Sequence, residues 1–229
     1  SPPGLPCGCG RRIVERMTTR RRRPLLWASE RRAFAMGYTV PAGIDEVGLG
    51  PLAGPAVAGA VVLPIGVRLP GLDDSKKLTA LQRERLAALI RRRALAWAVH
   101  EVPPATIDAA GLTRARELAM EGAVRALQVA ADYLLIDAWD VPALPLPQMC
   151  VVKGDGTSAS IMAASIVAKV HRDGLMVAYD KLYPGYGFAV HKGYATAAHR
   201  RALRELGPTP IHRHSWAPVR AAQALLNRA

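Results

Sequence analysis

Four acidic side chains stand at positions where a carboxylate is costly. Asp45 ends one apolar run and Glu46 follows it directly, Asp137 ends a second apolar run, and Asp173 lies on a long helical segment one turn after Lys169. Carboxylates at the ends of buried strands repel one another unless a cation lies between them. Hard divalent cations bind through such oxygen ligands, and a carboxylate cluster holding two ions is suited to phosphodiester hydrolysis. The pattern therefore suggests a metal-dependent centre for phosphoryl hydrolysis.

Each of these residues also has a simpler interpretation. An Asp at the end of a strand is commonly a turn former or a helix cap, and Asp173 beside Arg172 fits an ordinary surface ion pair. Ser158 and Ser160 fit a helix cap better than a nucleophile. The sequence contains no P-loop, no dinucleotide-binding glycine fingerprint and no G-x-S-x-G elbow. The metal hypothesis therefore depends on the four carboxylates converging in the fold.

The elements that must position these residues follow from the hydrophobic pattern, which predicts one α/β domain with a mixed sheet and a helical C-terminal part. Strands are expected at the short apolar segments, namely Ala42–Asp45, Ala56–Leu63, Leu95–Val102, Tyr133–Ile136 and Met149–Val152. Helices are expected at the segments with helical spacing, namely Trp27–Gly37, Thr79–Arg93, Leu112–Ala131, Ser158–Leu182, Ala195–Leu206 and Pro218–Asn227.

Composition favours a globular protein with a polyanionic partner. Half of the 229 residues are hydrophobic, which excludes a disordered chain, and the formal net charge is +13. Residues 1–40 contain nine Arg, so much of the excess lies near the N-terminus. No apolar run approaches the roughly 20 residues of a membrane span. Three cysteines cannot form a disulfide framework, so we expect a reducing cytoplasm, and the Cys7-x-Cys9 pair lacks the partners of a zinc site.

A series of motifs resembles one family, the type 2 ribonucleases H known as ribonuclease HII, over roughly residues 25–220. These motifs are A-G-I-D-E-V-G-L-G-P-L-A-G-P at 42–55, D-S-K at 74–76, L-I-D at 135–137, V-K-G-D at 152–155, A-A-S-I-V-A-K-V-H-R-D at 163–173, H-K-G-Y-A-T at 191–196 and I-H-R-H-S-W-A-P at 211–218. The resemblance implies a ribonuclease H-like core with a mixed five-stranded sheet flanked by helices, and a helical C-terminal extension.

The resemblance also implies an activity and a cofactor. The expected enzyme is an endoribonuclease that hydrolyses the RNA strand of RNA–DNA hybrids and cleaves 5′ of ribonucleotides embedded in duplex DNA, giving 5′-phosphate and 3′-hydroxyl ends. The implied metal ligands and catalytic residues are Asp45, Glu46, Asp137 and Asp173, and the expected ions are Mn²⁺ or Mg²⁺. Three alternatives stay open: another ribonuclease H-like nuclease of the resolvase or integrase type, a non-catalytic nucleic-acid-binding protein, and an inactive family member.

Substrate contacts are implied at a second set of positions. These are Gly48, Leu49, Gly50, Ser75, Lys76, Lys153, Asp155, Lys169 and Tyr194. The backbone at Gly48 and Gly50 would read the ribose 2′-hydroxyl, and Tyr194 would pack on the following deoxyribose. For Tyr194 a packing aromatic is the simpler alternative. The lysines would contact phosphates, together with Lys192, and Asp155 would support the metal centre.

Two residues depart from the family pattern. Leu49 stands where the family has Arg between two glycines, so a phosphate contact worth about 1.5–3 kcal/mol should be missing. Leu49→Arg should then tighten binding to a single embedded ribonucleotide. Ala138 stands where Gly is commoner, and we expect little effect.

The expected organisation is a basic, disordered arm at 1–23, a catalytic domain at 24–190 and a substrate-binding extension at 191–229. We expect a monomer that binds RNA–DNA hybrids and ribonucleotide-containing DNA, with no membrane association and no obligate protein partner.

Overall fold

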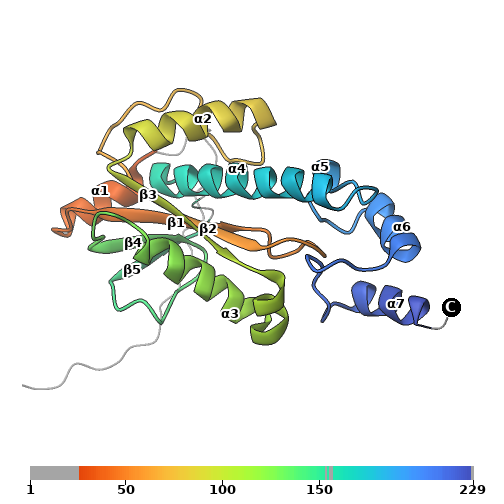
Figure 1. Cartoon of the computed structure of the whole chain (residues 1–229). Coiled ribbons are helices and arrows are strands. Elements are labelled where there is room, and N and C mark those ends of the chain that lie inside the picture. Colours follow the sequence, from red (N-terminus) through yellow and green to blue (C-terminus); the bar gives the residue numbers. More distant parts are fainter. Residues whose placement is uncertain (1–25, 153, 155–156, 228–229) are drawn as a thin grey trace, which may run out of the picture.

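A five-stranded mixed sheet forms the centre of the molecule, in a computed structural model that describes residues 26–152, 154 and 157–227 (Figure 1). The strand order is β3-β2-β1-β4-β5. β1 is antiparallel to β2 and parallel to β4, which continues in parallel to β5. The strands are β1 Pro41–Val47, β2 Ala56–Val62, β3 Ala96–Val102, β4 Tyr133–Asp137 and β5 Gln148–Val151.

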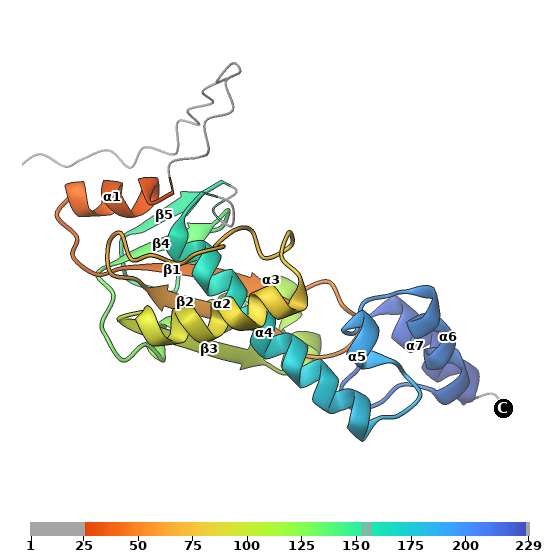
Figure 2. The ribbon, with the colours of Figure 1, turned by 90° about the horizontal axis from the view of Figure 1, so that it is seen from above.

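Seven helices within the described residues surround this sheet, and their arrangement produces the layers seen in Figure 1. They are α1 Ala28–Ala35, α2 Ala80–Arg93, α3 Pro104–Arg125, α4 Ala159–Leu182, α5 Phe188–His191, α6 Ala197–Leu206 and α7 Ala217–Leu226. α4 and α2 cover one face of the sheet and α3 covers the other, while α5, α6 and α7 gather beyond one end (Figure 2). This confirms the expected five-stranded core and the helical C-terminal part.

Small residues let α4 lie directly on the central strand. A Cβ atom at Gly43 on β1 would stand 2.1 Å from the backbone carbon of Ser160, so only glycine fits there. The first half of α4 is rich in Ala and buried on all sides, because it meets β1 and β2 on one flank and α2 on the other. Close packing at this point brings Ser165 of α4 to the end of β1, where the acidic residues lie.

One predicted helix differs from the structure. The sequence places it at Leu112–Ala131, whereas α3 begins at Pro104 and ends at Arg125. A proline at the first position of a helix lacks only an amide that would be unpaired anyway, so the two prolines start the helix. Gly111 has a φ of 79° and kinks it. The short helix α5 was not predicted.

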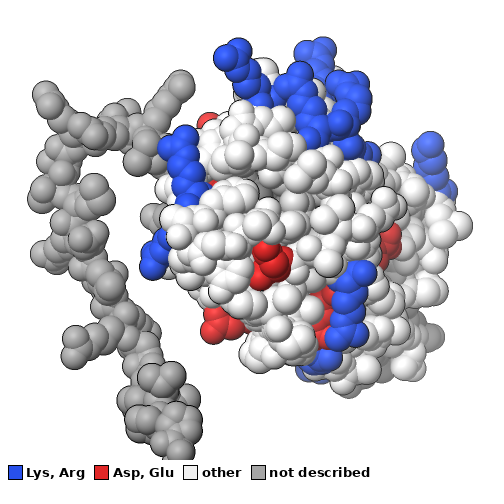
Figure 3. All heavy atoms as spheres, turned by 90° about the vertical axis from the view of Figure 1, so that its left-hand side faces the viewer, with Lys and Arg blue, Asp and Glu red and all other residues white. Residues whose placement is uncertain are grey.

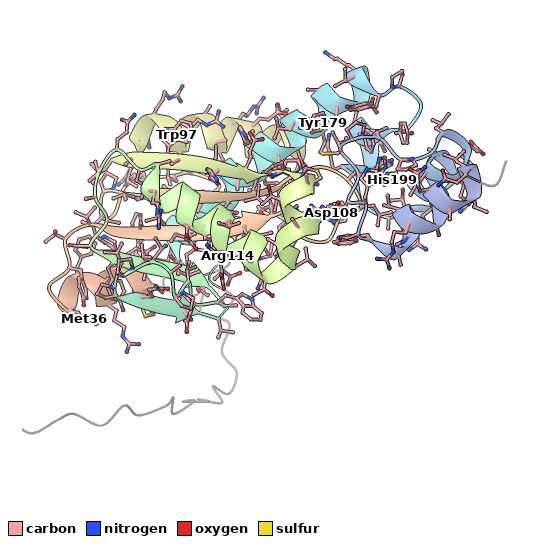
Figure 4. All side chains as sticks on the ribbon, turned by 60° about the horizontal axis from the view of Figure 1, so that its bottom comes forward. Met36, Trp97, Asp108, Arg114, Tyr179 and His199 are labelled. Atoms are coloured by element: carbon pink, nitrogen blue, oxygen red, sulfur yellow. The ribbon has the colours of Figure 1, made fainter. Side chains whose placement is uncertain are left out.

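The C-terminal helices are joined to the core by shared apolar and polar contacts. One hydrophobic cluster combines Ala53 and Met176 with Phe188, Ala202 and Ile211, so it crosses the expected boundary at residue 190. On α3, Asp108 accepts hydrogen bonds from the backbone amides of His214 and Ser215 at 2.7 and 3.0 Å. Figure 4 shows Asp108 where α3 meets this part of the chain.

Two expectations fall outside the described residues: the basic arm at 1–23 with its cysteine pair, and the site residues Lys153 and Asp155. Within the part of the chain that the structure describes, none of the helices combines the length and apolar character needed to cross a bilayer.

Candidate active site

Three of the four predicted carboxylates line one cavity at the carboxyl ends of two parallel strands. Asp45 and Glu46 lie in the last three residues of β1. Asp137 ends the neighbouring strand β4, one step beyond the pair Ile44–Ile136. The cavity has a volume of about 260 Å³. It is lined by Asp45, Glu46, Val47, Gly48, Ser75, Lys76, Arg83, Asp137, Ser165, Lys169 and Tyr194.

Asp45 is buried among like charges. Burial, followed by the charges of Glu46 and Asp137, raises the pKa of Asp45 from 3.8 to about 8. The Ser165 hydroxyl and the Glu46 amide act in the opposite direction, the latter donating to Asp45 Oδ1 at 2.9 Å. A carboxyl in this position is held in one orientation, yet the described residues supply no cation that compensates it fully.

Glu46 and Asp137 also contact groups outside the carboxylate cluster. Burial raises the pKa of Glu46, and the Arg116 guanidinium, whose Nε lies 3.4 Å from Glu46 Oε1, partly opposes this shift. The backbone amide of Gly154 donates to Asp137 Oδ1 at 2.8 Å. Arg116 and the Gly154 amide therefore restrain the two side chains, and both carboxylates still line the cavity.

The fourth carboxylate, Asp173, lies in the adjoining cavity of about 720 Å³, which shares Arg83 and Lys169 with the first. Lys169 Nζ donates to Asp173 Oδ1 at 2.7 Å, and Arg83 Nη2 is 3.7 Å from Oδ2. The neighbouring Arg172 is not its surface ion-pair partner. Arg172 is buried and donates to backbone carbonyls, among them that of Pro55 at 2.9 Å.

The donor chemistry suits a hard divalent cation, because every candidate ligand is a carboxylate oxygen. The raised pKa of buried Asp45 indicates a carboxyl that a bound cation would stabilise in its ionised form. Among the described residues, no three Asp, Glu, His or Cys side chains already converge as a finished metal site. Convergence of all four carboxylates is therefore not observed, and Asp173 is the one set apart.

The glycine segment after β1 is held by two buried arginines. Gly48 has a φ of 86°, and a Cβ there would stand 2.1 Å from Arg172 Nε, so the fold itself requires glycine. Arg213 donates to the carbonyls of Gly48 and Leu49, and to that of Gly54 at 3.0 Å. Sequence reasoning missed Arg213, although it lies in the quoted motif at 211–218, because burial of an arginine cannot be read from its type.

The remaining predicted contacts divide into those that line the cavity and those that do not. Lys76, Lys169 and Tyr194 line it, and the Tyr194 side chain is 45% exposed, unlike a packed core aromatic. Gly50 is exposed with open space where a Cβ would stand, whereas Leu49 packs against the hydrophobic cluster beneath α3.

Ser75 reaches the cavity, but its hydroxyl is engaged with Ser165 Oγ at 2.9 Å. Since Ser165 also bonds to Asp45, the two serines form a chain that orients this carboxyl. Ser165 was not among the predicted site residues. Lys192 lines the second cavity, and its Nζ donates to the Ala189 carbonyl at 2.7 Å.

Basic side chains gather on the surface of the molecule over α2. Figure 3 shows the end of the molecule opposite the C-terminal helices, and on it basic side chains gather along the top, where α2 lies. The last turn of α2 carries Arg91, Arg92 and Arg93. Most of this face is uncharged, and acidic side chains on it are few.

A mixed sheet with acidic residues at the ends of β1 and β4, covered by α4, defines the class of ribonuclease H-like nucleases. The model of the ribonuclease HII family matches residues 42–219. The chain therefore belongs to the ribonuclease HII family, and it is an endoribonuclease.

Individual relatives support this assignment. Ribonuclease HII of Geobacter sulfurreducens is 52% identical over 197 residues, covering 86% of this chain and 91% of its own length. The crystal structure of ribonuclease H2 from Pyrococcus horikoshii OT3 superposes with a TM-score of 0.75 at 26% identity, covering 83% of this chain and 100% of that one. Bst-RNase HIII in complex with Mn²⁺ has a TM-score of 0.65 at 21% identity, covers 86% and 73% of the two chains, and shows likeness of fold alone.

Proposed function

We propose that this endoribonuclease hydrolyses the RNA strand of RNA–DNA hybrids and cuts duplex DNA 5′ of an embedded ribonucleotide, leaving 5′-phosphate and 3′-hydroxyl ends. The observation that carries the proposal is the buried carboxyl of Asp45 between Glu46 and Asp137, in one cavity with the exposed ring of Tyr194. A phosphodiester is negatively charged, so bound cations would offset its repulsion by the three carboxylates of this cavity.

Asp45, Glu46, Asp137 and Asp173 would hold Mg²⁺ or Mn²⁺, and the Mn²⁺ complex of Bst-RNase HIII supports a metal of this kind. When bound, such ions lower the pKa of a water and stabilise a departing oxygen. The protein's own contribution is orientation. Ser165 and the Glu46 amide fix Asp45, and the Gly154 amide fixes Asp137.

Recognition of the ribonucleotide would come from the segment after β1 and from Tyr194. The 2′-hydroxyl is the group that distinguishes RNA from DNA, and an exposed backbone at Gly50 lets a sugar approach closely. Tyr194 would pack on the next deoxyribose. Lys76 and Lys169, at the rim of the same cavity, would contact phosphates, with Lys153 and Asp155 as further members of the site.

The test uses three duplexes: DNA with one ribonucleotide, a continuous RNA–DNA hybrid, and DNA alone, each with Mg²⁺, Mn²⁺ or EDTA. We expect metal-dependent cutting of the first two and none of the third. Asp45→Asn and Asp173→Asn should abolish cutting. Asp180→Asn is the matched control, because Asp180 lies on α4 two turns beyond Asp173 and lines neither cavity. Cutting of the all-DNA duplex would instead favour a resolvase-type nuclease.

We further propose that the chain acts as a cytoplasmic monomer without an obligate protein partner, with residues 24–190 catalytic and 191–229 binding substrate. Size-exclusion chromatography with light scattering tests the oligomeric state, and a dimer would contradict it.

A further inference from the structure

Arg116 is a cation beside the active-site carboxylates that the predicted site did not include. It lies on α3, with Nε 3.4 Å from Glu46 Oε1 and Cζ 4.4 Å from the ring centroid of Trp139. The Nε atom is buried and has no hydrogen-bond partner among the described residues. Trp139 follows Asp137 by two positions and is 55% exposed. The guanidinium is therefore held by a ring and one carboxylate at the edge of the site.

Two other cations that line the cavities, Lys169 and Arg83, already have acceptors within the described structure. Lys169 donates to Asp173, and Arg83 donates to the carbonyls of Ser75 and Leu78 at 3.0 and 2.6 Å. Arg116 differs, because its Nε has no hydrogen-bond partner among the described residues, while its carboxylate partner Glu46, like Asp173, is a predicted metal ligand. When a cation engages Glu46, the donors of Arg116 lose part of that partner and need another anion.

Leu49 supplies no cationic side chain to the segment after β1. Its side chain packs against a hydrophobic cluster that includes Ala115 and Ala119, the α3 residues on either side of Arg116 in the sequence. Leucine has no hydrogen-bond donor for a phosphate, so the side chain at position 49, two residues after β1, is apolar. Arg116 lies on α3, which contributes Ala115 and Ala119 to the same cluster, and its Nε is 3.4 Å from Glu46 Oε1.

We propose that Arg116 binds a substrate phosphate beside Glu46 and so supplies the guanidinium contact absent at Leu49; this rests on the proposed ribonucleotide-cleaving function. A guanidinium presents its donors in a planar fork that matches phosphate oxygens. Stacking on Trp139 holds that plane, so the fork is oriented before the substrate arrives.

The test compares Arg116→Met with Arg114→Met. Arg114 lies on the same helix, two positions away, and pairs with Glu117 and Glu121 (Figure 4). Steady-state cleavage of a duplex with one ribonucleotide gives KM and kcat. Fluorescence anisotropy in an Asp173→Asn background, with Mg²⁺ and varied KCl, gives Kd without cutting.

For Arg116→Met we expect Kd and KM to rise about 10- to 100-fold, since a charge-assisted hydrogen bond is lost. The slope of log K against log salt should fall in magnitude by about 0.9, the value for one phosphate contact. Arg116→Lys should restore the slope and part of the affinity, and Arg114→Met should stay within about twofold of the unchanged protein. Adding Leu49→Arg to Arg116→Met should recover affinity more than Leu49→Arg does alone.

An unchanged Kd and salt slope in Arg116→Met would overturn the proposal, whether or not kcat falls. A shifted pH profile of kcat with unchanged Kd would show that Arg116 acts only through Glu46. Should Arg116→Met fail to fold, judged by circular dichroism, Trp139→Ala replaces it, and its KM should rise about 3- to 10-fold. Failure of the unchanged protein to cut the single-ribonucleotide duplex would count against the proposed function, and the Kd comparison would still decide the role of Arg116.

Discussion

Asp45→Asn should make the metal-free protein more stable at neutral pH, although it removes activity. The pKa of Asp45 is raised from 3.8 to about 8 by burial and by the charges of Glu46 and Asp137. At pH 7 the carboxyl of Asp45 is ionised in the unfolded chain, whereas in the folded metal-free chain it stays protonated. The difference extends over roughly three pH units at about 1.36 kcal/mol each, so Asp45 costs about 4 kcal/mol of folding free energy at pH 7.

The destabilisation by Asp45 depends on pH in a characteristic way. The cost is absent below the unfolded pKa, grows as pH rises, and is complete above the folded pKa. Asn cannot ionise, and its amide keeps the shape of the protonated carboxyl. The stability gain of Asp45→Asn should therefore be near zero at pH 4 and about 4 kcal/mol at pH 7, a rise in Tm of roughly 8–16 °C.

The assay is urea unfolding followed by circular dichroism, in EDTA, between pH 4 and pH 8, with Asp180→Asn as control. Adding Mn²⁺ should stabilise the unchanged protein by about 2.7 kcal/mol at a hundredfold excess over Kd, and the variant much less. Equal pH dependence of stability in the variant and the unchanged protein would refute the reasoning, as would a less stable variant at pH 7.

Three further outcomes follow from single side chains. Arg213→Met leaves buried carbonyls without a donor, so we expect a loss of about 2–5 kcal/mol in urea unfolding and a raised KM; an unchanged KM would separate Arg213 from substrate binding. Ala138 has a φ of 62°, so Ala138→Gly should stabilise by up to about 1 kcal/mol, and a lower Tm would contradict this. Burial, aided by His199, lowers the pKa of His212 to about 3, so stability should fall as pH drops below 6.5, by about 2 kcal/mol at pH 5. His212→Gln should flatten that dependence in thermal unfolding, and an unchanged slope would argue against it.

Much of the fold could be predicted because its signals are local. The capping box at Thr79 and Gln82 starts α2 where the sequence indicates, and α4 follows its cap at Ser158. Strands β1 to β5 coincide with the short apolar runs, and β1, β2 and β4 are almost wholly buried because helices cover both faces of the sheet. α3 was misplaced because prolines and Gly111 indicate breaks, and tertiary packing of the helix overrode them.

The candidate site could be predicted only in part, for a related reason. Residue types and order placed Asp45 and Asp137 at strand ends, and parallel pairing of β1 with β4 does bring those ends together. The place of Asp173 could not be predicted in the same way, because it depends on which side of α4 faces the cavity, where Asp173 pairs with Lys169.

The sequence by itself determined the family, the strands and the acidic residues that end them, because these depend on motif order and local pattern. Only the tertiary structure decided that Arg172 and Arg213 are buried beneath the glycine segment, and that Arg116 faces Glu46. An arginine has the same charge and size at the surface and in the interior. Its role is set by which carbonyls, rings and carboxylates the fold places around it.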